Sequence, residues 1–399
     1  MKKAARLFLI ILAVSALIAG SVVPVSASGK SKNQKNYCNI KSCANNGDWH
    51  NYPENSLEAV KNCKTDYVSV DVRLSSDGVP ILMEDSTVDR MCANADGSKT
   101  SGEVSSFTFS EIQTFRLRGG RGEIGAEVTD YGVAALNDVL KESDGKMLII
   151  DCSADDIDKI YSVVKAQNAA ERVLYRPDKG SSDLAQKYGN VIVKYNGNII
   201  FPVISAINKA GSTACRTVQL GTKNQYGVIF YNSVTERFAK KSVNAVFSAS
   251  DVYSGKRPDS RTGWDDAVSR GYNIIETDYP ELLNEYIGDI STQKEMLGAL
   301  LKECAEYKNG SYSKDTDAQF KKAYSNAESV YGGVSSLSEL EDAFVRLSDS
   351  FNALEQASDD SAPSRLNLSP GRIITIVLCL AAVIAAQLFF YKRRQSSNR

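Results

Sequence analysis

The feature that most constrains the fold is a regular alternation of short β-branched runs and helical patterns, which extends over about residues 39–290. Such an alternation predicts parallel strands joined by crossover helices. About 250 residues is the usual size of a (β/α)8 barrel, whose reactive groups lie at the C-terminal ends of its strands. A doubly wound open sheet is the alternative, but the sequence has no Gly-x-Gly-x-x-Gly pattern after a first strand to support it. The clearest predicted strands are Tyr67–Val72, Pro80–Glu84, Met147–Cys152, Arg172–Tyr175, Val191–Tyr195, Ala245–Ser248 and Asn273–Glu276, and helices between them include Asn55–Cys63, Leu136–Glu142, Ile157–Gln167 and Trp264–Arg270.

A helical pattern without strands occupies residues 292–357. Apolar residues recur there at three- and four-residue spacing in three stretches, separated by Asn-Gly and Gly-Gly dipeptides that stop helices. The pattern predicts a small three-helix module, which resembles the helical repeats of bacterial surface proteins. Residues 358–371, rich in Ser, Asp and Pro, are typical of a linker. The three predicted helices are Thr292–Tyr307, Asp315–Tyr331 and Leu337–Leu354.

The two ends of the chain predict its compartment. A basic start, an apolar run and small residues before position 28 are typical of a secretory signal peptide, here residues 1–27. Residues 373–391 are almost wholly apolar and are followed at once by Lys392-Arg393-Arg394, which predicts one transmembrane helix with a cytoplasmic tail over 392–399. We therefore expect a single-pass cell-membrane protein with its bulk extracellular. The short, lysine-rich signal favours a Gram-positive bacterium, and an uncleaved N-terminal anchor is the alternative.

Charge and residue counts exclude some partners. The formal net charge is −1, but the first and last 27 residues carry seven bases and no acid, so residues 28–372 sum to −8. Because nucleic-acid affinity rests on neutralising phosphates, this acidic body is not expected to bind nucleic acid. The chain has a single histidine, His50, so a zinc site of the Cys/His type is not expected. Cys38, Cys43 and Cys63 are close enough in sequence to permit a disulfide.

Several short blocks follow one another between residues 44 and 280. Ala44–Gly47 is followed after five residues by Pro53–Leu57, and the last block is Gly271–Pro280. Between them lie Val70-Asp71-Val72-Arg73-Leu74, Asp77-Gly78-Val79-Pro80, Glu84-Asp85-Ser86-Thr87-Val88-Asp89-Arg90, Ala135-Leu140 and Leu148–Ser153. In this order the blocks resemble the glycerophosphodiester phosphodiesterase family. The resemblance implies a TIM barrel with a small insertion, here about residues 86–134.

The resemblance also implies a phosphoric diester hydrolase of lipid metabolism that uses two histidines as general acid and base. In this sequence the first histidine position is Asn45, the neighbouring arginine position is Asn46, and the second histidine position is Glu84. Asn45 has no proton that titrates near neutrality, so it cannot act as a general acid or base. His50 lies five residues from the position it would have to replace and is expected to be a surface residue. We therefore expect a pseudoenzyme.

Carboxylates expected at the barrel mouth indicate a candidate cation site. Asp71, Glu84 and Asp151 are each predicted at the C-terminal end of a strand, where they repel one another unless they are paired, protonated or holding a cation. Oxygen ligands suit Ca²⁺ or Mg²⁺, which the family also uses. A solvated acidic mouth without a ligand is the alternative. Three further positions are carried over as substrate or support residues: Glu54, which keeps the family's residue, Ser69, which stands at the family's first metal-binding carboxylate, and Ser153, which stands at its lysine.

Two functions remain open at this point. The first is a surface module that binds a phosphodiester-containing wall polymer or a lipid head group without standard hydrolysis. The second is a divergent metal-dependent phosphodiesterase that hydrolyses glycerophosphodiesters, with Glu84 and Asp71 sharing the proton work. A structural spacer is a third option, which the retained Glu54, Asp71 and Asp151 disfavour. Some arginines can reach a phosphate from the mouth or the insertion, and some aromatic residues can flank a glycerol or sugar. The default expectation is surface exposure for the arginines and barrel packing for the aromatic residues. These side chains are Arg73, Arg90, Arg116, Arg118, Arg121, Trp49, Tyr52 and Phe247.

Overall fold

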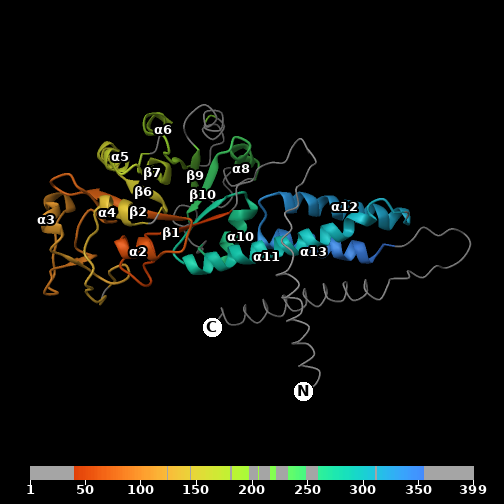
Figure 1. Cartoon of the computed structure of the whole chain (residues 1–399), viewed down its shortest axis with the longest axis horizontal. Helices are drawn as coiled ribbons and strands as arrows, with labels where there is room; N and C mark the ends of the chain where they lie inside the picture. The colour runs from red at the N-terminus through yellow and green to blue at the C-terminus, as the bar shows by residue number, and fades with distance from the viewer. Residues whose placement is uncertain are drawn as a thin grey trace, which may run out of the picture. The chain divides into compact units, whose positions relative to one another are not determined.

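A barrel of parallel strands forms the larger part of the molecule. The computed structural model describes residues 40–354, apart from 124, 144, 180–181, 197–204, 206–215, 222–231, 249–258 and 311. Within these residues, parallel strands pair in the order β7-β6-β2-β1-β11-β10-β9-β8 (Figure 1). A parallel bridge between Tyr175 of β7 and Val191, two residues before β8, connects the two ends of this order. The expected parallel barrel is therefore confirmed over the open sheet. The barrel strands are β1 (Lys41–Asn45), β2 (Tyr67–Leu74), β6 (Met147–Cys152), β7 (Val173–Pro177), β8 (Val193–Asn196), β9 (Thr217–Gly221), β10 (Asn244–Ser248) and β11 (Ile274–Thr277).

Helices pack against the outside of these strands, as Figure 1 shows for α4, α5 and α6. Side chains along a strand alternate between the two faces, so each strand supplies one set to the helices and another to the barrel interior. On β6, Leu148 and Ile150 face the helices, whereas Ile149 packs inside with Cys43 and Leu174. The barrel therefore has an outer core and an inner core. The described helices around it are α2 (Leu57–Asn62), α4 (Leu136–Glu142), α5 (Ile157–Ala166), α6 (Ser182–Tyr188), α8 (Asn232–Ala239) and α10 (Arg261–Ser269), with a 3-10 turn, η2, at Ala170–Arg172.

One predicted strand lies outside the parallel barrel. Residues Pro80–Leu82 form β3, but β3 runs antiparallel to β2, with Leu82 opposite Val72. Five residues separate β2 from β3, and a parallel return needs a crossover of about a dozen or more. The expectation that Glu84 follows a barrel strand is therefore wrong: Glu84 follows this antiparallel extension.

The expected insertion at residues 86–134 is a small lobe with its own apolar core. It contains β4 (Cys92–Ala93) paired antiparallel with β5 (Arg116–Leu117), the 3-10 turn η1 (Val104–Ser106) and α3 (Phe109–Ile112). A capping box at Thr108 and Glu111 fixes the start of α3. The lobe returns to the C-terminal ends of the barrel strands, where the Glu54 N–H donates to the Gly120 carbonyl at 2.9 Å. Its core residues include Ile81, Met83, Val88, Met91, Ile112 and Phe115.

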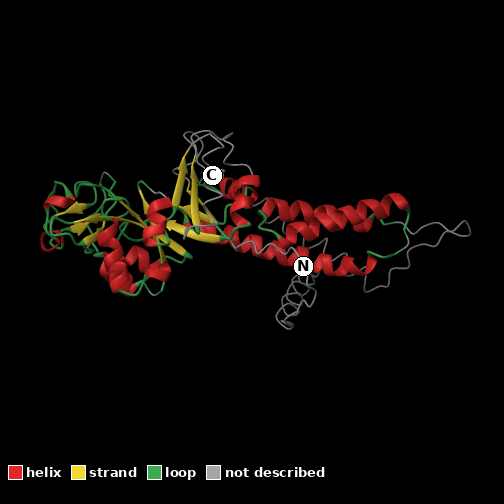
Figure 2. Ribbon diagram, turned by 90° about the horizontal axis from the view of Figure 1, so that it is seen from above, coloured by secondary structure: helices red, strands yellow, loops and turns green. Residues whose placement is uncertain are grey.

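A helical module follows the barrel (Figure 2). Its first helix, α11 (Pro280–Cys304), begins directly after β11 and crosses the expected boundary at residues 290–292 without a break. Proline suits the first turn of a helix, which explains why the helix begins at Pro280 and not at Thr292. The later helices match the expected positions closely. They are α12 (Lys314–Gly332) and α13 (Leu337–Asn352), with a 3-10 turn, η4, at Ala305–Tyr307.

The module packs against the barrel through hydrogen bonds as well as apolar contacts. The Tyr286 hydroxyl on α11 donates to Asp265 of α10 at 2.9 Å, and the Ser338 hydroxyl on α13 donates to the same carboxylate at 2.5 Å. The Asn284 amide of α11 donates to the Lys64 carbonyl, just before β2. These contacts place the module against the outer helix α10 and the N-terminal ends of the strands, away from the ends that the insertion reaches.

Several predicted segments lie outside the described residues: the signal peptide at 1–27, the linker at 358–371, the span at 373–391 and the tail at 392–399. Within the described part of the chain, no helix has both the length and the hydropathy to cross a bilayer. Cys43 and Cys63 are free, because Cys43 faces the barrel interior and Cys63 the outer core, so the disulfide considered between them does not form. Cys38 lies outside the described residues.

Candidate functional site

The candidate site lies at the C-terminal ends of the barrel strands, called the barrel mouth below. Strand register places Asn45 beside Ser69, Asp71 beside Asp151, and Asp151 beside Arg176. An apolar interior layer that includes Cys43, Ile149, Leu174, Ile192, Val246 and Ile274 supports these polar residues from below. The strands thus bring Asn45, Asp71 and Asp151 to one end of the barrel, which the sequence predicted for Asp71 and Asp151 from their positions at strand ends.

A buried arginine occupies the interior of the mouth. Arg176 is 6% exposed, and its Nε and Nη2 donate to the two Asp151 oxygens at 2.7 and 2.5 Å. Its Nη1 and Nη2 donate to Glu276 at 2.9 and 2.6 Å, and Nη1 also donates to Gln219 at 3.2 Å. A guanidinium has five N–H donors, so all of them are engaged. Because these partners come from β6, β11 and β9, the Arg176 side chain ties strands across the barrel interior.

The charge of Arg176 controls the ionisation of Glu276. Burial would raise the pKa of Glu276, but the positive charge and hydrogen bonds of Arg176 outweigh burial and bring the pKa down to about 2. Glu276 is therefore a buried carboxylate that stays ionised because its partner is close. We call Asp151, Arg176, Gln219 and Glu276 the interior network.

Asp71 has a different environment beside this network. Asn55 donates from Nδ2 to an Asp71 carboxylate oxygen at 3.2 Å and accepts the Asp71 backbone N–H at 2.9 Å. Burial raises the pKa of Asp71 to about 7, and the negative charge of Asp151 acts in the same direction. A pKa near neutrality makes Asp71 an acid–base candidate in the mouth.

The two asparagines at the end of β1 are fixed by hydrogen bonds. Asn45 donates to Asp278 at 3.0 Å and accepts from the Ser69 hydroxyl at 3.3 Å, so both ends of its amide are used. Asn46, at φ 59°, donates to Glu84 at 3.4 Å. The next residue, Gly47, has φ +82°, and a Cβ there would lie 2.8 Å from the Ala59 backbone. The β1 loop thus packs tightly on α2 and places an amide where a proton donor was implied.

Glu54 holds the insertion against the mouth. Its carboxylate is 1% exposed and lies 2.6 Å from Arg90 Nη2 and 3.6 Å from Arg121 Nε. Burial raises the pKa of Glu54 to about 7, against the opposing effect of Arg90. Arg90 also pairs with Asp85 at 2.7 Å and with Glu84 at 3.3 Å. Glu54 and Arg90 therefore serve to position the lobe, and Glu84, whose side chain is 46% exposed, lies at this outer edge.

Arg121 and three aromatic side chains form the rim of the mouth. Arg121 donates from Nη2 to Asp278 at 2.5 Å, and its guanidinium lies 4.5 Å over the Trp49 ring. Its Nη1 has no hydrogen bond to any residue that the structure describes. Trp49 stacks on the exposed His50 at 3.8 Å, and His50 lies 5.5 Å from Tyr279. The Trp49 indole N–H is buried without a partner among the described residues. The rim thus offers cationic and aromatic surface together.

The remaining predicted residues have other contacts. Arg73 donates from Nε to the Glu84 carbonyl at 3.1 Å. Arg116 donates to backbone carbonyls of its own lobe, and the Ser153 hydroxyl accepts from the Asp155 N–H. The aromatic residues Tyr52 and Phe247 pack edge-on against Tyr131 and Tyr272, and Arg118 donates its backbone N–H to Met91. No described contact joins these groups to the interior network.

Sequence reasoning missed the centre of the interior network. Arg176 and Gln219 were not candidates, although Arg176 stands within a run, Val173–Pro177, that is buried throughout. A charged residue in such a run requires a buried partner, and that was the available signal. Glu276 belongs to the last sequence block, but its role depends on Arg176.

The expected cation ligands are held separately. Asp151 is engaged by Arg176, Asp71 by Asn55, and the Glu84 carboxylate by Arg90 and Asn46. In the part of the chain that the structure describes, no group of three or more His, Cys, Asp or Glu side chains has an arrangement that holds a metal ion. Ser69 contributes a hydroxyl where a carboxylate was implied. These residues do not fit a Ca²⁺ or Mg²⁺ ion in their present contacts, since such ions need several free oxygen ligands.

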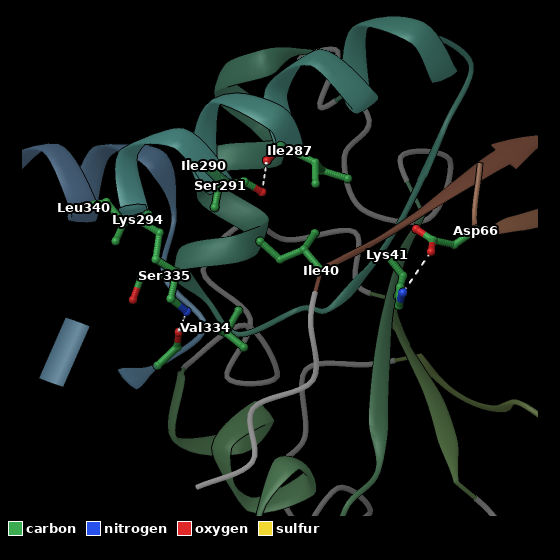
Figure 3. A pocket seen from close by; sticks show the side chains of 11 residues that line it. Ile40, Lys41, Asp66, Ile287, Ile290, Ser291, Lys294, Val334, Ser335 and Leu340 are labelled. Atoms are coloured by element: carbon green, nitrogen blue, oxygen red, sulfur yellow. Dashed lines mark hydrogen bonds and ion pairs between the residues drawn. The ribbon is translucent and has the colours of Figure 1, made fainter. Parts of the chain in front are cut away.

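A cavity of about 400 Å³ lies at the opposite end of the barrel, between the start of β1 and the helical module (Figure 3). Ile40, Ile287 and Ile290 supply apolar walls. Its charged groups are paired: Lys41 with Asp66 at 2.9 Å, and Lys294 with the Gly333 carbonyl at 3.2 Å. We interpret the cavity as a packing gap between the barrel and the helical module, because its walls are apolar and its charged groups are paired.

Comparison with known proteins agrees with the sequence blocks. Residues 46–225 match the profile of the Glycerophosphoryl diester phosphodiesterase family. Glycerophosphodiester phosphodiesterase 1 of Rattus norvegicus and of Homo sapiens are each 40% identical to this chain over 78 residues, 18% of this chain and 22% of each relative. The Bos taurus protein is 35% identical over 77 residues. The match thus covers only 22% of the length of these curated relatives.

Solved structures of the same description also align with this chain. A glycerophosphoryl diester phosphodiesterase from Parabacteroides distasonis aligns with a TM-score of 0.48 and 20% identity over 63% of this chain and 87% of that one. A phosphodiesterase from Oleispira antarctica, solved with the product sn-glycerol-3-phosphate, aligns with a TM-score of 0.45 and 15% identity over 61% of this chain and 95% of that one.

Proposed function

We propose that this barrel, in which residues 46–225 match the Glycerophosphoryl diester phosphodiesterase family, binds a glycerophosphodiester group without hydrolysing it by the two-histidine route. The observation that carries this proposal is Asn45. Its amide stands where the family's first histidine is implied, and hydrogen bonds to Asp278 and Ser69 fix it there. A positioned general acid or base contributes typically about 10²–10⁴-fold to a rate, and an amide cannot supply that contribution.

The rim supports binding in place of turnover. Among the described residues no group accepts a hydrogen bond from Arg121 Nη1, while Nη2 donates to Asp278, Nε lies 3.6 Å from Glu54 and the guanidinium lies over the Trp49 ring. Arginine suits phosphate because its planar fork of donors matches the geometry of the oxygens. The exposed faces of His50 and Tyr279 can pack against a glycerol or sugar. A phosphodiester at Arg121 would therefore lie beside aromatic surface and above the interior network.

We further propose where this binding takes place. With residues 1–27 as a signal and 373–391 as a membrane span, the barrel lies outside the cell and the protein stays at the membrane. The phosphodiester then comes from a wall polymer or a lipid head group, most simply in a Gram-positive bacterium. These two sources share the glycerophosphodiester chemistry, so separate ligands must distinguish them.

A second function is favoured by one observation, the Asp71 pKa of about 7. A general base works best when its pKa is near the operating pH. In this alternative, Asp71 takes a proton from the water that attacks phosphorus, and Arg121 binds the phosphate. The bond from phosphorus to the leaving alcohol oxygen breaks, and that oxygen takes a proton that Glu84 relays from solvent. The alternative predicts slow hydrolysis that disappears when Asp71 loses its carboxylate.

The test uses the full-length protein in detergent micelles. Binding of glycerophosphocholine, of a soluble poly(glycerol phosphate) oligomer and of phosphatidylglycerol vesicles is measured, and phosphomonoester release is followed in the same samples. We expect binding of at least one ligand without release, and loss of that binding in Arg121→Ala. Arg346→Ala is the matched control, since Arg346 is 69% exposed on α13.

The possible outcomes separate the two functions. Release that persists in wild type and is lost in Asp71→Asn would establish the second function and reject the first. Binding that is equal in wild type and Arg121→Ala would reject the rim as the ligand site. Absence of binding by all three ligands would reject the proposal that the barrel recognises a glycerophosphodiester.

A further inference from the structure

The interior of the mouth contains a cation that belongs to the chain itself. Arg176 lies on β7, and its partners Asp151 and Glu276 lie on β6 and β11. All five of its N–H donors are used within the interior network, and the side chain is 6% exposed. An unpaired buried charge is too costly to persist. The burial of Arg176 therefore depends on its two carboxylate partners and on its complete set of hydrogen bonds.

The charges around Arg176 are close to balanced. Asp151 and Glu276 bring two negative charges to one guanidinium, and Lys194 on β8 adds positive charge near Asp151. Register places Lys194 beside Gln219, itself a partner of Arg176. The carboxylates of the interior network therefore already have cationic side chains near them from two strands, Arg176 on β7 and Lys194 on β8, while Gln219 on β9 adds a neutral hydrogen-bond partner for Arg176.

The same carboxylates would be attractive ligands for a divalent ion if the guanidinium were absent. Ca²⁺ takes six to eight oxygen ligands at about 2.3–2.6 Å, and Mg²⁺ takes six at about 2.0–2.1 Å. Each Asp151 and Glu276 oxygen now accepts at least one N–H from Arg176. An ion entering the network would have to displace a buried arginine, whose charge would then lack a partner.

We propose that the Arg176 guanidinium takes the place of the divalent cation that the family resemblance implies, so that this barrel neither requires nor binds Ca²⁺ or Mg²⁺ at its mouth. The guanidinium neutralises and orients the carboxylates from within the protein. The site thereby keeps a fixed positive group at the mouth without depending on the metal content of its surroundings. This inference rests on the contacts of Arg176 and does not depend on which ligand binds at the rim.

Thermal unfolding of the full-length protein in micelles tests the proposal. Wild type is measured in EDTA and then with Ca²⁺ or Mg²⁺ added in excess, and we expect the same Tm in all three conditions. Arg176→Ala should unfold at lower temperature in EDTA and should gain a Ca²⁺-dependent rise in Tm of at least about 3 °C, because freed carboxylates create a site that only the folded state has. Adding Asp151→Asn to Arg176→Ala should abolish that rise.

Two controls keep the result interpretable. Arg172→Ala removes a partly buried arginine that donates to the Ser143 hydroxyl at 2.8 Å and to backbone carbonyls but to no carboxylate, so it should be destabilised without a response to Ca²⁺. Arg176→Lys keeps a positive charge and should respond to Ca²⁺ less than Arg176→Ala. Calorimetric titration of wild type with Ca²⁺ gives the direct readout if Arg176→Ala does not fold.

Either of two results would overturn the proposal. One is a Ca²⁺-dependent rise in the wild-type Tm, or calorimetric Ca²⁺ binding, that is lost in Asp151→Asn. The other is a folded Arg176→Ala variant with no Ca²⁺ response, which would mean that the network carboxylates are no latent cation site. Failure of phosphodiester binding would leave these metal measurements unchanged, so the two proposals fail separately.

Discussion

The interior network and the rim stand at the same end of the barrel and are both built around an arginine, but they use it differently. Arg176 in the interior is buried and has every donor engaged, whereas the rim residue Arg121 is 28% exposed and keeps Nη1 without a hydrogen bond to described residues. Arg176 stands on a barrel strand, and Arg121 comes from the insertion.

At one end of the barrel, different arginines therefore contribute to stability and to ligand binding. The interior arginine ties β6, β7, β9 and β11 together, so its contribution is to the folded state. The rim arginine is anchored on one side by Asp278 and Trp49, which orients it but leaves donor capacity for a ligand. Removing one or the other should therefore change different measured quantities.

The largest expected effect is on stability. Arg176→Ala leaves Asp151 and Glu276 buried without their cation, and breaking a buried charged network in this way typically costs about 3–5 kcal/mol of unfolding free energy. Arg121→Ala removes a partly exposed ion pair with Asp278 and a cation–π contact with Trp49, which together should cost less, about 1–2 kcal/mol. Denaturant unfolding in metal-free buffer measures both. Equal losses for the two variants would remove the distinction between interior and rim.

The second effect is on ligand binding and should have the reverse order. Arg121→Ala is expected to weaken glycerophosphodiester binding by about tenfold or more, equivalent to about 1.4 kcal/mol, because a charge-assisted hydrogen bond to phosphate is lost. Arg73→Ala, which removes a side chain that donates to the Glu84 carbonyl, is the matched cation control and should weaken binding less. Calorimetry with the best ligand of the three gives the affinities. A greater loss in Arg73→Ala would move the phosphate site away from the rim.

The third effect is a pH dependence of stability from Asp71. Folding raises the Asp71 pKa from 3.8 to about 7, so the folded state binds this proton more tightly than the unfolded state. The associated stabilisation is complete below about pH 4 and is lost as the pH rises through about 7. Stability should therefore fall between these values, and less steeply in Asp71→Asn. Glu54 adds a slope of the same sign, since its pKa is also raised to about 7.

Unfolding free energy measured at several pH values tests this expectation. Asp342→Asn is the control, because Asp342 is 58% exposed and pairs with Arg346 at the surface of α13. A slope in Asp71→Asn that equals the wild-type slope would contradict the buried, protonated state of Asp71. Glu276 contributes with the opposite sign at lower pH, since its depressed pKa makes stability fall as the pH drops below about 4.5.

The smallest effect concerns the aromatic part of the rim. Trp49→Leu removes the ring beneath Arg121, and cation–π contacts of this kind contribute about 0.5–2 kcal/mol. We expect a few-fold loss of ligand affinity and a small loss of stability. Because His50 is exposed and stacks from outside, His50→Ala should change affinity less than Trp49→Leu. The reverse order would indicate that the ligand contacts the imidazole directly.

Much of the fold could be predicted from sequence because its signals are local. The alternation of strands and helices follows from side-chain periodicity, and the separation of the helical module follows from the loss of strands after residue 290. The parallel barrel was recognised in this way. The orientation of β3 was missed, because alternating side chains do not show whether a strand runs parallel or antiparallel to its neighbour. The short connection after Leu74 indicates the antiparallel orientation, since it is too short for a crossover.

The site was harder to predict because its partners are distant in sequence. Asp71 and Asp151 were placed at the mouth from their positions at strand ends, and only the resemblance singled out Asn45. The pairing of Arg176 with Glu276 spans 100 residues and depends on the circular order of the strands, which no local pattern encodes. The separation of Asp71, Glu84 and Asp151 into different contacts has the same origin. Conformation at the mouth is set by the closed barrel, not by the individual segments.

The most direct test of a non-hydrolysing, metal-independent barrel is phosphorus NMR of the full-length protein with glycerophosphocholine, first in EDTA and then with excess Ca²⁺. We predict broadening or a shift of the phosphodiester resonance in both conditions, with no phosphomonoester resonance in either. A phosphomonoester resonance that grows after Ca²⁺ is added, and that is absent from an Asp71→Asn sample, would contradict both the loss of hydrolysis and the replacement of the cation by Arg176.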